Sequence, residues 1–308
     1  MIRRLAPWLG PAALAAALEP FVRSDGGDTW LFVRAGRTLL SSGWSHAFAD
    51  KAIQAGPLQL ALFGSLGRSQ GALAAVLAAT AALLVTAAAR SAGVSRPRVL
   101  ALAGLAAVAT GFTTHVFDAG HPADGLVPLL WILAAADARR GRTGRAALVV
   151  GLSAGFETWG VLGIAVLALA PSVRAAARGV VLAGAVAALL YLPFVLAGDF
   201  AMSDYRWSIA PQSLLGHVFA TGTAFGWPLR LAQGAVALAV GVAVARAARS
   251  SAHVTWLVPM SVVLVRLALD PIDHGYYFDG VQAAALVALA LVAARGLRVP
   301  RLAREPVA

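Results

Sequence analysis

Cysteine is absent from this chain of 308 residues, and lysine occurs only once, at Lys51. Without cysteine the chain forms neither disulfide bonds nor thiolate metal sites. Charged residues are also scarce, at 13% against 59% hydrophobic residues. Because a soluble domain carries about 25% charged residues, a chain this apolar cannot cover a water-facing surface. The composition therefore predicts a membrane protein.

No nucleotide-binding motif occurs in the sequence, and the net charge of +11 does not indicate nucleic-acid binding. The arginines are dispersed among long apolar runs, whereas a nucleic-acid-binding domain gathers them on one polar face. We interpret the excess positive charge as a signal of membrane topology. The Ala- and Arg-rich, Lys-poor composition is typical of GC-rich bacterial genomes, so we expect a bacterial plasma membrane.

Apolar runs reach or approach the roughly 17–25 residues that one bilayer crossing requires. They are 5–18, 71–89, 99–117, 122–136, 146–170, 180–197, 229–245, 254–269 and 277–294. The first run is short and contains Pro7 and Pro11, so a cleavable signal peptide is the alternative there. No small-residue cleavage site precedes Glu19, and we predict an uncleaved first helix.

Charges of opposite sign fill alternate gaps between these runs. Because arginine-rich loops stay cytoplasmic, the pattern predicts cytoplasmic termini, a basic cytoplasmic tail at 295–308 and a carboxylate-rich extracytoplasmic face. The run 146–170 fits only if it enters and leaves on one side, since Arg145 and Arg174 flank it. Glu157 in its middle predicts two half-helices that meet there and line protein or water; a kinked full crossing is the alternative.

The fold class is therefore predicted to be an all-α polytopic membrane protein forming one domain over 1–308. It has about nine transmembrane helices plus a broken half-helix pair. Two extracytoplasmic loops, 20–70 and 198–228, are long enough to be functional. Within the first, the spacing of apolar residues over 28–40 predicts an amphipathic helix on the outer membrane surface, ending at Gly43. The apolar stretch 57–63 is too short to cross.

Asp28 stands at the expected start of that surface helix. One reading is a helix N-cap, in which the carboxylate accepts backbone N–H groups. The other is a general base that takes a proton from a hydroxyl group at the membrane surface. Residue type alone leaves both open.

Several stretches resemble one enzyme family. The first loop reads Asp25-Gly-Gly-Asp28-Thr-Trp-Leu-Phe32, then Leu-Leu-Ser-Ser-Gly43 and Gly56-Pro-Leu. Gly120-His-Pro-Ala-Asp124, Gly151-Leu-Ser-Ala-Gly-Phe156 before Trp159-Gly, and Asp270-Pro-Ile-Asp-His-Gly-Tyr276-Tyr277 follow in order. Together they are similar to membrane glycosyltransferases of the GT-C fold, most of all to family 87, the polyprenyl-phosphate-dependent mannosyltransferases of actinobacteria.

The resemblance implies an extracytoplasmic transfer of a sugar, mannose in this family, from a polyprenyl-phosphate donor to a lipid or glycan acceptor. It implies no cofactor, and it makes Asp28 the catalytic base. Two departures stand out. Family members often have a lysine where Glu157 stands, and they are longer by two or more helices.

The stretch after 266 holds a second group of polar side chains. Tyr276 and Tyr277 are either an aromatic membrane anchor or substrate contacts, and His274 is a candidate for the donor phosphate. Arg266, inside an apolar run, is either a functional group or a side chain that snorkels to the headgroups. Arg206 and Arg230 suit a phosphate but equally suit lipid headgroups.

The predicted site then has three groups of residues. The catalytic residue is Asp28. The donor-phosphate residues are Arg266, Arg230, Arg206 and His274. The substrate residues are Asp25, His121, Asp124, Glu157, Asp270, Tyr276 and Tyr277. No metal is predicted, because His115, Asp118, His121 and Asp124 straddle a turn rather than one helix face.

Two other functions remain open from the sequence. A broken helix pair at Glu157 also suits a transporter or flippase for a lipid-linked or anionic substrate, although no internal repeat is visible. A catalytically inactive relative acting as a subunit is the third possibility.

Overall fold

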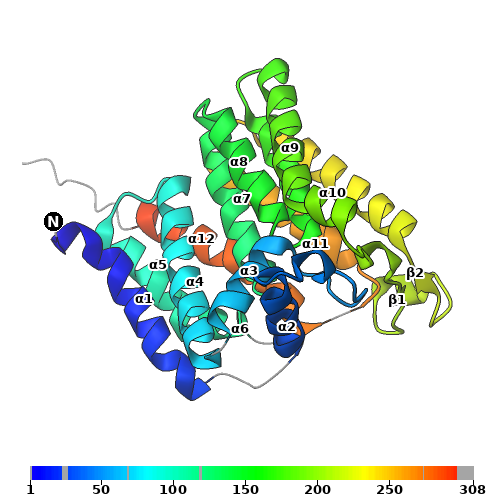
Figure 1. Cartoon of the computed structure of the whole chain (residues 1–308). Helices are drawn as coiled ribbons and strands as arrows, with labels where there is room; N and C mark the ends of the chain where they lie inside the picture. The colour runs from blue at the N-terminus through cyan, green and yellow to red at the C-terminus, as the bar shows by residue number, and fades with distance from the viewer. Residues whose placement is uncertain (1, 23–26, 68, 118–119, 273, 297–308) are drawn as a thin grey trace, which may run out of the picture.

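The computed structural model describes residues 2–22, 27–67, 69–117, 120–272 and 274–296, and most of them are helical (Figure 1). The first half contains α1 (Ile2–Val22), α2 (Thr29–Leu39), η1 (Trp44–His46), α3 (Pro57–Leu66), α4 (Gln70–Ala92), α5 (Pro97–Ala109), α6 (Phe112–His115) and α7 (Ala123–Arg139). The second half contains α8 (Thr143–Ala154), η3 (Thr158–Leu169), α9 (Val173–Ala197), η4 (Met202–Asp204), η5 (Leu214–His217), α10 (Trp227–Ala247), α11 (Val254–Ala268), η6 (Gly275–Phe278) and α12 (Asp279–Gly296).

Four of the helical segments in the described ranges are long and apolar enough to cross a membrane, which indicates a membrane protein. They are α4, α9, α10 and the segment Gly275–Gly296. Apolar helices α5, α8, η3 and α11 are shorter, at 10–17 residues. The predicted apolar runs thus coincide with helices, but length and hydropathy support four spans rather than about nine.

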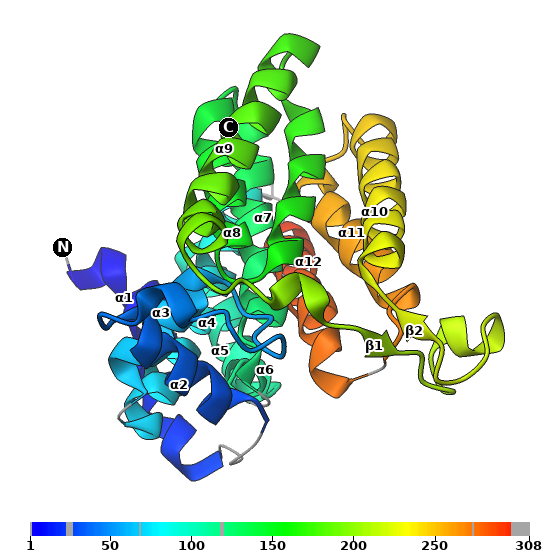
Figure 2. The ribbon, with the colours of Figure 1, turned by 45° about the vertical axis from the view of Figure 1, so that its right-hand side comes forward.

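Helix α7 lies in the middle of the bundle and joins two hydrophobic cores. Leu126, Leu129 and Ile132 belong to a core shared with α2, α3, α4, α5 and α12. Val127, Trp131 and Ala134 belong to a second core, shared with α8, η3, α10 and α11. Because residues three and four apart share a helix face, two faces of α7 serve the two cores. Figures 1 and 2 show α1, α4 and α5 grouped together and α10 beside α11.

The predicted break near Glu157 is confirmed as a hairpin. The Ser153 hydroxyl in α8 donates to the Gly160 carbonyl in η3 at 3.0 Å, so the chain reverses between them. At the far end, a Cβ added to Gly179 of α9 would lie 2.9 Å from Thr143 and 3.3 Å from Leu167. The two outer ends of the pair therefore lie together, as predicted. The second half is a 3-10 helix rather than an α-helix.

Three sequence predictions need correction. The run 99–117 is not one helix. The Thr110 hydroxyl donates to the Ala106 carbonyl, and Gly111 adopts φ +76°, which interrupts the helix. The surface helix ends at Leu39 rather than Gly43, because the Ser41 N–H and hydroxyl both donate to the Thr38 carbonyl and turn the chain. The all-α class has one exception among the described residues, because loop 198–228 contains a two-residue antiparallel pair, β1 (Trp207–Ser208) with β2 (Ala224–Phe225).

The first loop, 20–70, forms a helical layer instead of an open connection. Helices α2 and α3 cross at Gly36 and Gly64, where a Cβ on either residue would overlap the other chain. Leu31, Phe32 and Val33 are buried, while Trp30 is 62% exposed. The predicted amphipathic helix is therefore present, and its Trp30 points away from the bundle. Of the predicted basic tail, Arg295 lies inside α12, and residues 297–308 are outside the described ranges.

Candidate functional site

One cavity of about 430 Å³ gathers side chains from six separate segments. It is lined by the first loop, the start of α7, the break between α8 and η3, the β1–β2 region, the first half of α10, and the α11–η6 connection. Its size lies within the range of about 300–1,000 Å³ typical of small-molecule sites. One wall is rich in carboxylates, a second contains two arginines that are each paired with an aspartate, and a third is apolar.

The acidic wall is a chain of three side chains, Asp28, His121 and Glu157. The Nε2 of His121 lies 3.2 Å from Asp28 Oδ2, and its Nδ1 lies 2.9 Å from Glu157 Oε1. Two aromatic rings contact the imidazole: Tyr276 stacks on it at 5.0 Å, and Phe32 lies perpendicular to it at 5.2 Å. Two carboxylates on one imidazole indicate that both ring nitrogens carry hydrogen.

The first-loop helix and the start of α7 meet at a glycine. Gly120 adopts φ +80°, and a Cβ there would lie only 2.7 Å from the Thr29 backbone nitrogen. This close approach puts His121 beside Asp28. Asp28 occupies the N-cap position of α2 but makes no capping hydrogen bond with its side chain. Its carboxylate is 54% exposed and bonds to His121 instead, so the capping interpretation is wrong.

These contacts shift the pKa values of both partners in opposite directions. The hydrogen bond from His121 outweighs partial burial and lowers the pKa of Asp28. Burial by itself would lower the pKa of His121, but the hydrogen bonds to Asp28 and Glu157 outweigh it and raise that pKa to about 10. At neutral pH His121 is therefore an imidazolium paired with the Asp28 carboxylate.

Glu157 is fixed by the first loop. Residue 157 is extended and forms an antiparallel bridge with Ala55, while the Gly56 N–H donates to the Phe156 carbonyl at 2.6 Å. The second carboxylate oxygen of Glu157 accepts the Trp159 indole N–H at 2.6 Å. The break in the half-helix pair is thus held open by backbone pairing, which satisfies the groups that a helix would otherwise pair.

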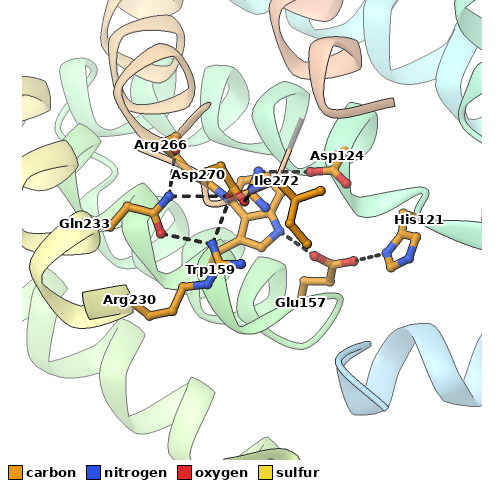
Figure 3. A network of polar contacts seen from close by, with 9 residues as sticks. All are labelled: His121, Asp124, Glu157, Trp159, Arg230, Gln233, Arg266, Asp270 and Ile272. Carbon is orange, nitrogen blue, oxygen red and sulfur yellow. Dashed lines mark hydrogen bonds and ion pairs between the residues drawn. The ribbon is translucent and has the colours of Figure 1, made fainter. Parts of the chain in front are cut away.

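The basic wall contains two arginine–aspartate pairs (Figure 3). Arg266 lies 3.1 Å from Asp124, and its guanidinium stands 4.3 Å over the ring of Trp159. Arg266 is 7% exposed, so it does not snorkel. Arg230, on the first turns of α10, lies 2.9 Å from Asp270.

Secondary contacts tie these two pairs together. Gln233 accepts from Arg230 at 3.0 Å and donates to the Arg266 carbonyl at 2.7 Å. The Arg230 guanidinium lies over the Trp207 ring, 4.0 Å from its centroid. One oxygen of Asp124, Oδ2, is buried and has no hydrogen-bond partner. Asp124 itself lines the cavity.

Most of the predicted site residues meet in this cavity. Those that line it are Asp28, His121, Asp124, Glu157, Arg230, Arg266, His274, Tyr276 and Tyr277. Asp270 is buried behind the lining and contacts the lining residues Arg230 and Gln233. Arg206 is a correction: it is exposed, it does not line the cavity, and its guanidinium is turned back onto the Ser203 and Tyr205 carbonyls. Asp25 lies outside the described residues.

Several polar or aromatic side chains of the cavity were not in the predicted site. Gln54 and Tyr205 line it from the two long loops, and Gln233 lines it from α10. For Gln233 a signal existed, since an amide three residues after Arg230 in an apolar run shares its helix face. No pattern marked Gln54 or Tyr205, because loop residues have no periodicity.

A metal can be considered at one point of the acidic wall. Donor atoms of His121, Asp124 and Glu157 lie within 4.8 Å of one another. A ligating histidine needs a lone pair on the ring nitrogen facing the metal, but both His121 nitrogens are engaged by carboxylates. Asp124 is already paired with Arg266. The donor set therefore suits hydrogen bonding better than cation binding, and the expectation of no metal stays a prediction. Of the other residues weighed, His115 lies by Asp279, and Asp118 is outside the described ranges.

The third wall is an apolar limb on α10 and η3. It is formed by Val161, Leu162, Leu231, Gly234 and Leu238. Leu231, Gly234 and Leu238 follow the spacing of one helix face. Leu231 is 68% exposed, so this limb opens at the side of the bundle rather than at its end.

No protein-family model matches this chain, and no curated protein or solved structure matches it either. Function must therefore be argued from the cavity itself. Its chemistry combines an exposed carboxylate held by an imidazolium, two arginines and a lateral apolar opening.

Proposed function

We propose that this protein is an inverting membrane glycosyltransferase of the GT-C type. It transfers a sugar, mannose by the resemblance to family 87, from a polyprenyl-phosphate donor to a lipid or glycan acceptor. The observation that carries the proposal is the convergence of Asp28, Arg230 and Arg266 on one cavity with an apolar limb. A polar cavity with a lateral apolar exit suits a substrate that has a charged head and a hydrocarbon chain.

Each wall has a role in the reaction. Asp28 accepts the proton of the acceptor hydroxyl while that oxygen attacks the anomeric carbon. The bond from that carbon to the phosphate oxygen breaks, and its electron pair leaves with the phosphate. The transition state resembles an oxocarbenium ion, and one displacement inverts the configuration. Carboxylates at the acidic wall favour the positive charge that develops on the sugar.

The leaving phosphate is stabilised at the basic wall. Arg230 and Arg266 each use one nitrogen on an aspartate, which leaves further N–H donors for phosphate oxygens. His274 lines the cavity as well and stacks on Tyr276 at 5.2 Å. Preorganised donors that face a developing charge supply a large part of catalysis in such sites.

With this function we propose the membrane topology predicted from the sequence. Termini are cytoplasmic, the cavity faces the extracytoplasmic side of a bacterial plasma membrane, and the chain crosses about nine times. Helices too short to span alone, such as α5 and α11, cross together with the turns that follow them. Membrane lipids surround the bundle and deliver the donor through the lateral opening.

The decisive experiment follows the label of the donor. Purified protein in liposomes is given radiolabelled mannosyl-phosphoprenol and bacterial membrane lipids as acceptor. We expect the label to move onto the acceptor lipid, with release of prenyl phosphate. Movement of intact labelled donor between leaflets would instead indicate a flippase, a function that the hairpin at Glu157 also suits. The absence of both transfer and movement would indicate an inactive relative.

Filling the apolar limb should discriminate between donors of different chain length. A Cβ on Gly234 would already lie 3.3 Å from Leu162, so Gly234→Phe obstructs the limb. We expect KM for a long-chain donor to rise roughly 10-fold or more, as for other changes in apolar pockets. KM for a donor with one or two isoprene units should stay unchanged.

Val236→Phe is the matched control, because Val236 lies on α10, is 46% exposed and does not line the cavity. It should leave both KM values unchanged. An equal loss with long and short donors in Gly234→Phe would show that the limb does not hold the chain.

A further inference from the structure

We propose that Glu157 is a positioning residue for the transfer reaction, acting through His121 to hold Asp28 in its proton-accepting orientation. This inference rests on the proposed function and adds a residue that does not itself touch the reacting atoms. It also accounts for a carboxylate at a position where the resembling family often has a lysine.

The three side chains run from the buried Glu157 through His121 to the exposed Asp28. The Glu157 side chain is 9% exposed and the His121 side chain 13%, whereas the Asp28 side chain is 54% exposed. The buried end is bound to the Ala55 backbone bridge and to the Trp159 indole. The accessible end is the Asp28 carboxylate, which lines the cavity. Glu157 therefore orients His121, and His121 orients the Asp28 carboxylate.

The His121 ring is held in one orientation by its neighbours. Tyr276 lies parallel to it with an interplanar angle of 3°, and Phe32 meets it at 90°. Rotation of the ring would break two charge-assisted hydrogen bonds at once. His121 therefore fixes Asp28 Oδ2 only as long as its Nε2 carries hydrogen.

The charge on that imidazole depends on its neighbours. Asp28 and Glu157 contact its two nitrogens, and Asp124, which also faces Arg266, adds a more distant negative charge. Tyr276 covers one face. His274 stacks on the same tyrosine at 5.2 Å.

The direction of the pH effect follows from these contacts. The charge-assisted contact with both carboxylates requires the imidazolium, because a neutral ring keeps a hydrogen on only one nitrogen. This double contact is lost as pH rises through the pKa of His121, about 10 in the intact wall. Replacing Glu157 by glutamine removes a hydrogen bond and a charge that both raise this pKa. The loss of activity should then begin at lower pH.

The test is the pH profile of kcat for wild type, Glu157→Gln and Asp137→Asn, measured in liposomes from about pH 6 to about pH 10. We expect the alkaline decline of Glu157→Gln to move down by about one pH unit or more, with KM for the donor unchanged. Asp137→Asn is the matched control. Asp137 is a buried carboxylate at the other end of α7, paired with Arg142 and Arg145, and its variant should keep the wild-type profile.

Further outcomes keep the two proposals distinct. His121→Asn, which has no titrating ring, should show lower activity and no alkaline decline. Nitrogen NMR of histidine-labelled wild type should find the His121 ring doubly protonated at neutral pH, whether or not a variant folds. An active wild type with an identical profile in Glu157→Gln, or a neutral His121 ring, overturns the positioning role alone. Absence of transfer by wild type overturns the proposed function and this inference with it.

Discussion

Replacement of Asp28 by asparagine is expected to lower kcat for sugar transfer by about 10²–10⁴-fold, the usual contribution of a general base. The amide cannot accept the proton of the acceptor hydroxyl. It still accepts the hydrogen bond from His121, and the Asp28 side chain is 54% exposed, so the fold should persist. Initial transfer rates and the Tm of the purified variant measure the two effects separately. KM should change little, because the base acts in the transition state.

Asp50→Asn provides the matched control for this variant. Asp50 lies in the same loop, is 49% exposed, sits 3.8 Å from Arg34 and does not line the cavity. It should transfer sugar at the wild-type rate. Equal rates for wild type and Asp28→Asn would contradict the enzyme assignment, since a transporter needs no proton acceptor at this position.

The pKa of Asp28 also sets the acid limit of activity. The His121 hydrogen bond lowers this pKa below the ordinary aspartate value, so the carboxylate is ionised throughout the neutral range. The active ionised form is lost only as pH falls through the lowered pKa. Acid inactivation of transfer should therefore require a more acidic solution than an unpaired aspartate would.

The positions of the helices and the break at Glu157 were predictable because both follow from hydrophobic spacing. A long apolar run interrupted by a carboxylate between arginine flanks has few solutions in a bilayer. The interruption at Gly111 was missed, because glycine in an apolar run is also common in packed transmembrane helices. Its φ of +76° depends on the local turn rather than on composition.

The roles of individual polar residues were less predictable, because they depend on contacts between distant segments. Asp28 has the residue type and position of a helix cap, and only its proximity to His121, 93 positions away, removes that role. Arg206 and Arg230 have equal claims as phosphate ligands in the sequence. Asp270 orients Arg230 into the cavity, whereas local carbonyls hold Arg206 outside it.

Removal of the Arg266 charge should produce the largest loss of stability. Arg266 is 7% and Asp124 2% exposed, so Arg266→Met leaves an uncompensated carboxylate in the interior. Breaking a buried pair in this way costs about 3–5 kcal/mol. The cation–π contact with Trp159 is lost as well. Denaturant unfolding in detergent, followed by tryptophan fluorescence, measures the change.

Arg145→Met is the matched control, since it also removes an arginine from an ion pair. The Arg145 side chain is 71% exposed, and Asp137 keeps Arg142 as a second partner. Its cost should stay below about 1 kcal/mol, as for exposed pairs. Equal stability losses in the two variants would mean that the Arg266–Asp124 pair is hydrated rather than buried.

The double variant Arg266→Met with Asp124→Asn separates the two roles of this pair. With neither charge left to be solvated, the double variant should be more stable than Arg266→Met, and the double-mutant cycle measures the coupling between the two side chains. Transfer activity should not recover, because the phosphate loses a guanidinium donor and the sugar loses the Asp124 carboxylate. A double variant that is both stable and fully active would show that the pair is structural and that the phosphate binds at Arg230 alone.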